Sequence, residues 1–333
     1  MGEMNATIQT NKQKIIIFLR AIGQNKMLPA IGACILFFVL GEILSPGYLS
    51  SKNINNILAS GAILALAAAG QTLVIMSGQD GIDLSIGQVM SLSAVTTYMV
   101  LNGLDSKIPL ALGIVAVISA LIGFINGIGV VFVGLPPLVM TLGMSTVVQG
   151  LVFASNAGGT PVGKASPLLL EIASGRFGEI RYLAIVGIVA VIVIEILLKR
   201  TKYGQQLYLV GNNREAARLS GIPVKTIIMV TYILSGVLSG IAGFFLLGYA
   251  GTANLDLGGS YTVLTIAAVV IGGTQLSGGE GGYIGTFIGA VLMRLLTTVL
   301  VAVGLSDSVR NILVGIFLLI TLLAYARAPK LRQ

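Results

Sequence analysis

Apolar segments long enough to cross a bilayer recur along this chain, and they restrict its fold more than any other feature. The run from residue 27 to residue 44, for example, contains a single charged side chain, Glu42. Charged residues make up only 10% of the 333 residues, whereas soluble domains contain about 25%. Backbone groups in lipid must find their hydrogen-bond partners within the segment, which favours helices. The sequence therefore predicts an all-α membrane protein that crosses the bilayer many times.

Glycine, proline and aspartate residues divide the apolar sequence into ten predicted spans. The run 261–275 is short for a span, so we expect a broken or tilted helix there. The predicted fold is a polytopic bundle of about ten transmembrane helices, some of them broken, over residues 27–326, with polar segments 1–26 and 327–333 outside it. The predicted spans are 27–44, 54–77, 84–101, 108–133, 137–155, 182–198, 225–249, 261–275, 283–304 and 309–326.

The distribution of basic residues predicts the orientation of these spans, because Lys and Arg are enriched in short cytoplasmic loops. With the N-terminus in the cytoplasm, ten spans return the C-terminus to the same side. Thirteen of the 20 Lys and Arg residues then lie in cytoplasmic segments and five in outer loops, while Arg294 and Arg310 fall within spans. This bias accounts for the net charge of +8 without a nucleic-acid partner. Both termini and the loop 199–225 are thus predicted to be cytoplasmic.

The sequence contains little that is suited to catalysis. It has no histidine and one cysteine, Cys34, so the commonest metal ligand and general base is absent. Gly158–Ala165 resembles a phosphate-binding P-loop, but alanine stands where that loop needs Ser or Thr to hold Mg²⁺. Leu276–Glu280 resembles the signature sequence of ABC-type ATPases, yet no intact P-loop accompanies it. We therefore predict no catalytic, metal-binding or cofactor-binding residues, and no ATP hydrolysis by this chain.

Polar side chains within the predicted spans are costly in lipid and tend to face a partner or a water-filled path. Contact with a transported substrate and hydrogen bonding between helices are both open as explanations for each of them. Arg294 is the most costly, and we expect it to pair with Glu280, Asp80 or Asp83 or to face water. The candidates for a translocation path are Gln71, Thr72, Asn126, Thr141, Ser145, Gln149, Thr297 and Thr298.

The loop 199–225 is predicted to contain a helix of two to three turns. Asn212 is suited to the N-cap, and Glu215 three residues later would complete a capping box. Gly221 suits the left-handed position after a helix, and Pro223 prevents its continuation. On the residues alone, an ordinary surface helix explains this pattern as well as a functional one does.

Two short segments, Ser77–Gly81 and Ser277–Gly281, are similar in sequence, and each joins two predicted spans on the same side. Transporters are often built from internal repeats with interrupted helices, and this pair suggests such a repeat. The loops that include these segments are predicted to act as hinges. The residues assigned to them are Asp80, Asp83, Gly278, Gly279 and Glu280.

The segment Gly211–Pro223 resembles the coupling loop of ABC importer permeases of the ribose and other monosaccharide class. That class belongs to the branched-chain amino acid/sugar permease superfamily of bacteria. Further matches follow in order over most of the chain. They comprise Gly81–Gly87, Asn126-Gly127, Pro136-Pro137, Thr141–Gly143, Ile266–Thr274, Gly278-Gly279 and Gly285-Thr286.

The resemblance implies the permease subunit of an ATP-driven importer that translocates a ribose-like or other small sugar. It also implies three partners: a cytoplasmic ABC ATPase, an external (periplasmic) sugar-binding protein, and a second permease subunit, identical or related. The membrane would be the bacterial cytoplasmic (inner) membrane. Ala216 and Ala217 would enter a groove of the ATPase, while the charged residues of the coupling helix would fix its register. The residues assigned to this coupling helix are Gly211, Asn212, Asn213, Arg214, Glu215, Ala216, Ala217, Arg218 and Gly221.

The chain departs from the family pattern in two places. Tyr261 is followed by Thr-Val-Leu, where the family usually has two acidic residues. Thr297–Val299 replaces a typical Asn-Asn-Gly, and Arg294 stands where a small residue is expected. These departures leave open the substrate and whether the two permease chains are identical. The alternative function is an ion-coupled secondary transporter of a small polar solute, with Asp80, Asp83 or Arg294 as the coupling group.

Overall fold

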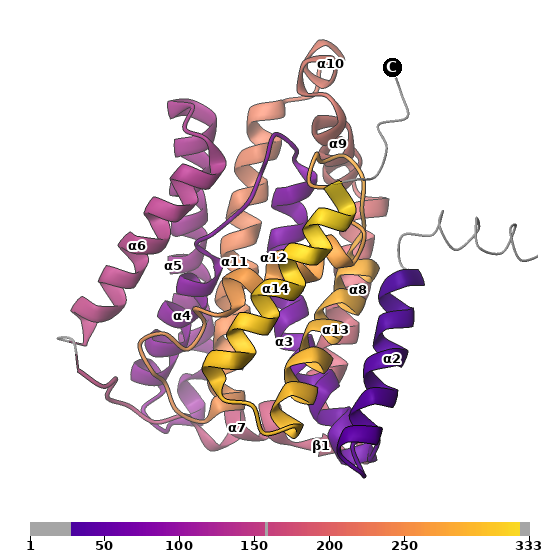
Figure 1. The fold of residues 1–333 in the computed structure, drawn as a ribbon. Helices are drawn as coiled ribbons and strands as arrows, with labels where there is room; N and C mark the ends of the chain where they lie inside the picture. The colour runs from indigo at the N-terminus through magenta and orange to yellow at the C-terminus, as the bar shows by residue number, and fades with distance from the viewer. Residues whose placement is uncertain (1–27, 157–158, 327–333) are drawn as a thin grey trace, which may run out of the picture.

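A computed structural model describes residues 28–156 and 159–326, and it is built almost entirely of helices (Figure 1). Within this part of the chain, six helical stretches are long and apolar enough to cross a membrane. The predicted terminal segments 1–26 and 327–333 lie outside the described residues. The six stretches are α3 (Ser51–Met76), α5 (Ile108–Ile128) with its flanking turns η1 (Asp105–Lys107) and η2 (Gly129–Val133), α6 (Pro137–Ser155), α8 (Tyr182–Arg200), α11 (Val224–Ala250) and α13 (Tyr283–Ala302).

Shorter apolar helices occupy the other predicted spans. They are α2 (Leu28–Leu44), α4 (Ile86–Leu101), α12 (Tyr261–Ile271) and residues 308–320 of α14 (Asp307–Ala326). The predicted all-α membrane class is confirmed, whereas the count of ten crossing helices stays a prediction. The number of crossings is not settled by helix length, because α4 and α12 are too short to cross a hydrocarbon core of about 30 Å by themselves.

The remaining elements lie at opposite ends of the bundle. The helices α9 (Lys202–Asn212) and α10 (Arg214–Leu219) form one end, at the top of Figure 1. Helix α7 (Pro167–Ser174) and the two-stranded hairpin of β1 (Arg176–Phe177) and β2 (Ile180–Arg181) form the other end. The loop 199–225 therefore lies across the membrane-spanning bundle from α7, as the predicted topology requires.

Helix α3 lies at the centre of the bundle, where 94% of its most apolar stretch is buried. It packs against α8, α11, α12 and α13. Small residues make this close packing possible, and a side chain on Gly70 would overlap the backbone of Ser235 in α11. By contrast, only 22% of the corresponding stretch of α6 is buried. An apolar helix with exposed side chains suits a surface that faces lipid or another subunit.

Two of the short helices, α4 and α12, follow stretches of chain that are not α-helical. The chain from Ser77 to Ser85 is not helical, and from the end of α3 it runs back along the bundle before α4 begins (Figure 1). The start of α4 meets the start of α12, because the Gly87 backbone nitrogen donates to Thr262 Oγ1 at 3.2 Å. The Gly258 nitrogen also donates to Ser91 Oγ at 2.9 Å. In the predicted span 261–275 the helix α12 ends at Ile271, and α4 is similarly short. That these two segments are broken or tilted crossings stays a prediction.

The end of α5 is distorted. After Ile128 the helix widens into the π-helical turn η2, which Gly134 ends in a left-handed conformation with φ of 78°. The Leu135 nitrogen donates back to the Gly129 oxygen at 3.0 Å, which closes the turn. Pro136 and Pro137 then start α6. This wide turn displaces Phe132 outward, and its side chain is 65% exposed.

Candidate functional site

The loop 199–225 holds two helices, α9 and α10, where the sequence predicted one. Leu207 and Val210 of α9 are fully buried and join the main core. Helix α9 was missed because it lacks a long apolar run and its apolar residues occupy only one side. The short helix in the predicted place is α10, which has six residues.

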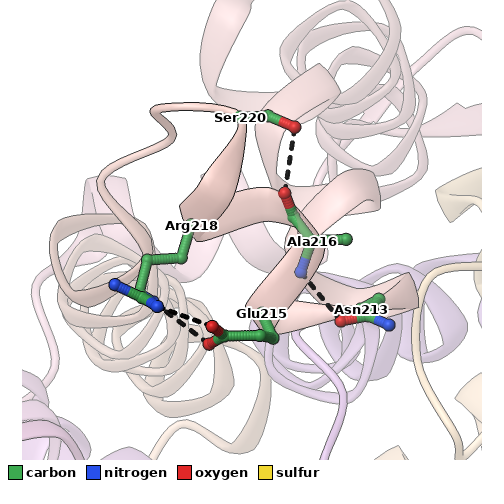
Figure 2. A network of polar contacts seen from close by, with 5 residues as sticks. All are labelled: Asn213, Glu215, Ala216, Arg218 and Ser220. Atoms are coloured by element: carbon green, nitrogen blue, oxygen red, sulfur yellow. Dashed lines mark hydrogen bonds and ion pairs between the residues drawn. The ribbon is translucent and has the colours of Figure 1, made fainter.

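The N-cap of α10 is Asn213, so the assignment of Asn212 was wrong by one residue. Asn213 has an extended backbone with φ of −159°, and its Oδ1 accepts a hydrogen bond from the Ala216 nitrogen at 3.0 Å (Figure 2). Asn212 cannot be the cap because α9 continues through it. Glu215 is then the second helical residue instead of the third, and no capping box forms.

Glu215 instead pairs with Arg218 on the outside of α10, with Oε1 and Nη2 2.6 Å apart (Figure 2). The hydrogen bond and charge of Arg218 lower the pKa of Glu215. Both side chains are about two thirds exposed, so the pair adds little to stability. The predicted end of the helix is confirmed, because Gly221 has a left-handed φ of 79° and Ser220 Oγ donates to the Ala216 oxygen.

Arg214 points inward, away from the surface that a partner would contact. Its Nη1 donates to Gln79 Oε1 at 2.6 Å. Its Nη2 donates to the backbone oxygens of Ser77 at 3.2 Å and Gly78 at 3.1 Å. Burial lowers the pKa of Arg214. The hydrogen bonds of Arg214 hold the first hinge loop. That Arg214 also fixes the register of a partner ATPase stays a prediction.

The two predicted hinge loops meet each other and the end of α9. The Gly279 nitrogen donates to the Met76 oxygen at 3.1 Å, and a side chain on Gly278 would overlap the backbone of Gly78. A side chain on Gly211 would overlap both loops. We call this contact of Gly78, Gly211, Gly278 and Gly279 the glycine junction. The similar sequences at 77–81 and 277–281 therefore come together in space.

Two more hydrogen bonds connect α9 to the second hinge loop. Tyr208 donates its hydroxyl proton to the Gly281 oxygen at 2.9 Å, and Asn212 Nδ2 donates to the Gly279 oxygen at 3.3 Å. Asp80 and Glu280 are exposed on the loops, and Glu280 accepts from Gln275 Nε2 at 2.8 Å. The α9–α10 unit is thus attached to the loop between α3 and α4 and to the loop between α12 and α13.

Ala217 is also an inward residue, with 3% of its surface exposed within the main core. The expectation that Ala217 enters a groove of the ATPase is wrong. The exposed face of α10 consists of Glu215, Ala216, Arg218 and Leu219. Leu219 is 74% exposed, and the sequence reasoning missed it. Its place three residues after Ala216 was the signal that could have identified it.

Asp83 lies deeper in the bundle and is 1% exposed. One carboxylate oxygen accepts from the Ser85 nitrogen at 3.0 Å and from Ser85 Oγ at 2.6 Å. The other accepts from Ser235 Oγ of α11 at 2.7 Å. Asn126 Nδ2 donates to Ser85 Oγ at 3.0 Å, and Thr141 bonds to the backbone on both sides of Asp83. Asn126 and Thr141 therefore support the non-helical segment.

The other path candidates are not gathered in one place. Gln71 is fully buried, and its amide atoms have no hydrogen-bond partner in the described part of the chain. Other candidates bond between or within helices, as for Thr72 Oγ1 with Thr286 Oγ1 at 2.8 Å and Thr298 Oγ1 with Tyr48 Oη at 2.6 Å. Thr297 bonds to its own helix, and Ser145 and Gln149 are half-buried on α6.

Arg294 has a different partner from those predicted. It donates to the Tyr261 hydroxyl, and its guanidinium lies over the Tyr261 ring at 4.7 Å from the centroid. Asp80 and Glu280 are on exposed loops, and Asp83 is occupied by serine hydroxyls. A cation on an aromatic ring is a way to hold Arg in an apolar interior.

The apolar helices, two of them short and preceded by chain that is not α-helical, are consistent with a membrane permease. The chain belongs to the family described as "Branched-chain amino acid transport system / permease component", whose model matches residues 53–322. It is therefore a translocation component of an ABC importer and not an enzyme. Family membership also favours the ABC permease over the ion-coupled transporter that the sequence left open.

Several characterised relatives are similar over nearly their full length. The ribose import permease protein RbsC of Bacillus subtilis is 36% identical over 90% of this chain and 92% of its own. The fructose import permease protein FrcC of Rhizobium meliloti is 30% identical over 96% and 90%. The galactose/methyl galactoside import permease protein MglC of Escherichia coli is 29% identical over 95% and 98%. No solved structure matches the chain significantly.

Proposed function

We propose that this permease translocates a monosaccharide or a similar small polyhydroxylated solute that an external binding protein delivers. The names of the relatives support a sugar, since they refer to ribose, fructose and galactose. Uncharged hydroxyl and amide groups of Ser85, Asn126 and Thr141 line the non-helical segment inside the bundle. Such groups can exchange hydrogen bonds with sugar hydroxyls without a change of charge.

The proposed topology has ten crossings in the bacterial cytoplasmic membrane, with both termini in the cytoplasm. Each of α4 and α12 completes a crossing together with the extended chain before it. The excess of Lys and Arg on the side of α9 and α10 supports this orientation. The position of α7 and the hairpin at the opposite end is consistent with it (Figure 1).

The exposed face of α10 is the proposed docking site for a cytoplasmic ABC ATPase. Leu219 and Ala216 offer apolar contact, and the Glu215–Arg218 pair beside them offers polar contact. Leu219 is 74% exposed, and contact with a partner would remove its apolar surface from water. Because Arg214 and Ala217 face the other way, the helix can contact the ATPase and the bundle at once.

The observation that most supports this function is the attachment of α10 to both hinge loops. Arg214 holds the loop before α4, and α9 holds the loop before α13 through Tyr208 and Asn212. Displacement of α10 by the ATPase would pull on both loops together. In this proposal Asn213 caps α10, Arg214 joins α10 to the first hinge loop, and the glycine junction joins α9 to both hinge loops.

A second permease subunit, identical or related, is proposed to complete the translocation path. The low burial of α5 and α6 supports this, since 28% and 22% of their apolar stretches are buried within one chain. Arg294 and the residues after Tyr261 depart from the family pattern. Because of these departures, the proposal leaves open whether the second permease chain is identical or related.

One experiment distinguishes binding of the ATPase to α10 from the transmission of its movement to the hinge loops. The permease is purified with the ATPase that associates with it, and uptake of ribose, fructose and galactose is measured in proteoliposomes. Leu219→Asp is expected to abolish association because it places a charge in the docking pocket. Leu104→Asp, a matched change of an exposed leucine at the other end, is expected to leave association intact.

Arg214→Gln is expected to keep association but to reduce sugar uptake at least about tenfold, because the loss of charged hydrogen bonds costs roughly 1.5–3 kcal/mol each. Permease amount and size-exclusion profile are measured for every variant. Normal association and uptake in both Leu219→Asp and Arg214→Gln would contradict the proposed role of α10. Uptake of none of the three sugars by the wild-type complex would contradict the proposed substrate class.

A further inference from the structure

A groove on the outside of the bundle, unrelated to α10 or to the hinge loops, has the form of a lipid site. It lies between the distorted end of α5 and the start of α11 and has a volume of about 530 Å³. Its lining residues are Phe124, Ile128, Phe132, Lys225, Thr226 and Met229. These residues belong to two helices that pack closely against each other.

The groove is polar at one end only. Lys225 and Thr226 are exposed in the first turn of α11, at the end of the bundle that holds α10. Phe124 lies eight residues before Phe132, which places it roughly 12 Å deeper at the helical rise per residue. Phe124 and Phe132 are 43% and 65% exposed. An occupant must therefore combine a long apolar part with a polar group at the membrane surface.

The positive charge of Lys225 at the polar end of the groove favours an anionic ligand. The Lys225 ammonium lies 5.5 Å from the centre of the Phe132 ring. Among the residues that the structure describes, Lys225 has no carboxylate partner. A cation at the membrane surface without an acidic neighbour attracts an anionic headgroup, and basic pockets between helices on the cytoplasmic side bind such lipids.

We propose that this groove binds one anionic phospholipid. Its phosphate lies at Lys225 and Thr226, and an acyl chain lies along Phe132, Ile128, Met229 and Phe124. Among the described residues, Lys225 and Thr226 are the only polar side chains in the lining, too few to bind the several hydroxyl groups of a sugar. The wide turn η2 forms the site, because it turns Phe132 out of α5 toward Lys225.

The absence of tryptophan from the chain allows a direct test. Phe132→Trp keeps an aromatic ring in the groove and introduces the only tryptophan. The full chain is placed in nanodiscs that contain brominated phosphatidylglycerol or brominated phosphatidylcholine in a non-brominated background, and quenching of the tryptophan is measured. Ile196→Trp, on the exposed side of α8 near the same end, is the matched control.

The expected result is an apparent affinity at Phe132→Trp about fivefold higher for the anionic lipid than for the zwitterionic one. Ile196→Trp is expected to show no preference. Addition of Lys225→Gln should abolish the preference, whereas Lys225→Arg and Lys202→Gln, which removes an exposed charge of α9, should keep it. If Phe132→Trp does not give a monodisperse protein, Phe124→Trp takes its place.

Three results would overturn the proposal. Equal quenching by the two lipids would show an unselective lipid surface. A preference that persists with Lys225→Gln would exclude Lys225 as the headgroup site. The absence of quenching by either lipid would show that protein covers the groove, and a second copy of the chain would then be its occupant.

Discussion

At the scale of single residues, the two sides of α10 have different roles. Arg214 and Ala217 are three residues apart and face the bundle, whereas Ala216 and Leu219, with the same spacing, face outward. Residues three apart lie on one side of a helix, so six residues suffice to present two surfaces. The inner surface holds the first hinge loop, and the outer surface is free to contact another protein.

Ala217→Asp is expected to destabilise the permease itself. A carboxylate at this buried position would lose its hydration, and Arg214 on the same side of α10 already donates to Gln79, Ser77 and Gly78. We therefore expect a cost on the order of 3 kcal/mol. The measurement is the thermal unfolding midpoint of the isolated chain in detergent, which should fall by several degrees. Ala216→Asp, the same change on the exposed neighbour, should leave the midpoint unchanged. An unchanged midpoint with Ala217→Asp would show that Ala217 faces outward after all.

Some residues of α10 have a local sequence signature and others do not. Gly221 could be assigned because a left-handed helix end has a strong local signature. Asn212 was assigned as the N-cap, whereas the cap in the structure is the next residue, Asn213, which is of the same type. The extent of α9, which ends at Asn212, decides between the two positions. The acceptors of Arg214 lie at Ser77, Gly78 and Gln79, far away in the sequence, so no local pattern could reveal them.

At the scale of elements, the interrupted crossings depend on polar groups that replace a helix. Only the two ends of the segment 77–85 take part in helical hydrogen bonds, through the Ser77 nitrogen and the Ser85 oxygen. The backbone and side chains between them need other partners within the bundle. Asp83 supplies the main connection, because it accepts from Ser85 on its own segment and from Ser235 on α11. Helix α11 begins next to α10. Through Ser235, Asp83 therefore connects the non-helical segment to the helix that follows α10.

Asp83→Asn is expected to lower the stability of the permease by roughly 1–3 kcal/mol. Asparagine keeps one acceptor oxygen, but its amide group cannot accept the proton of Ser85 or Ser235 at the other position. The thermal unfolding midpoint of the isolated chain measures the effect. Asp80→Asn is the control, because Asp80 is exposed and asparagine tolerates its left-handed backbone. Equal midpoints for the two variants would contradict the assigned role of Asp83.

The longest apolar helices were the easiest to predict from the sequence. The six long stretches were predicted to within a few residues because burial in lipid demands continuous apolar sequence. The break at 261–275 could be foreseen from its length. The contact between the two hinge loops could only be suspected from their similarity, since glycine-rich segments occur in many turns. The structure adds the glycine junction that joins them to α9.

At the scale of the whole molecule, the fold separates two ends with different chemistry. One end contains α9, α10 and the hinge loops, and the other contains α7 and the β1–β2 hairpin (Figure 1). Sequence reasoning could infer this separation from the alternation of spans. It could not establish which end faces the cytoplasm, because a bias of basic residues is a statistical indication. Accessible positions at the two ends can decide the orientation.

The last prediction concerns that orientation. Single cysteines are introduced at Val162, which is 83% exposed beyond α6, and at Ser220, which is exposed after α10, in a Cys34→Ala background. Val162 is preferable to the nearby Ser166, which is buried because its hydroxyl caps α7. A membrane-impermeant maleimide applied to intact cells should label Val162→Cys and leave Ser220→Cys unlabelled. Ser220→Cys should react once the membrane is permeabilised, which shows that the thiol is accessible. Labelling of Ser220→Cys from outside intact cells, with protection of Val162→Cys, would place α10 on the outer side, where no ATPase could drive it.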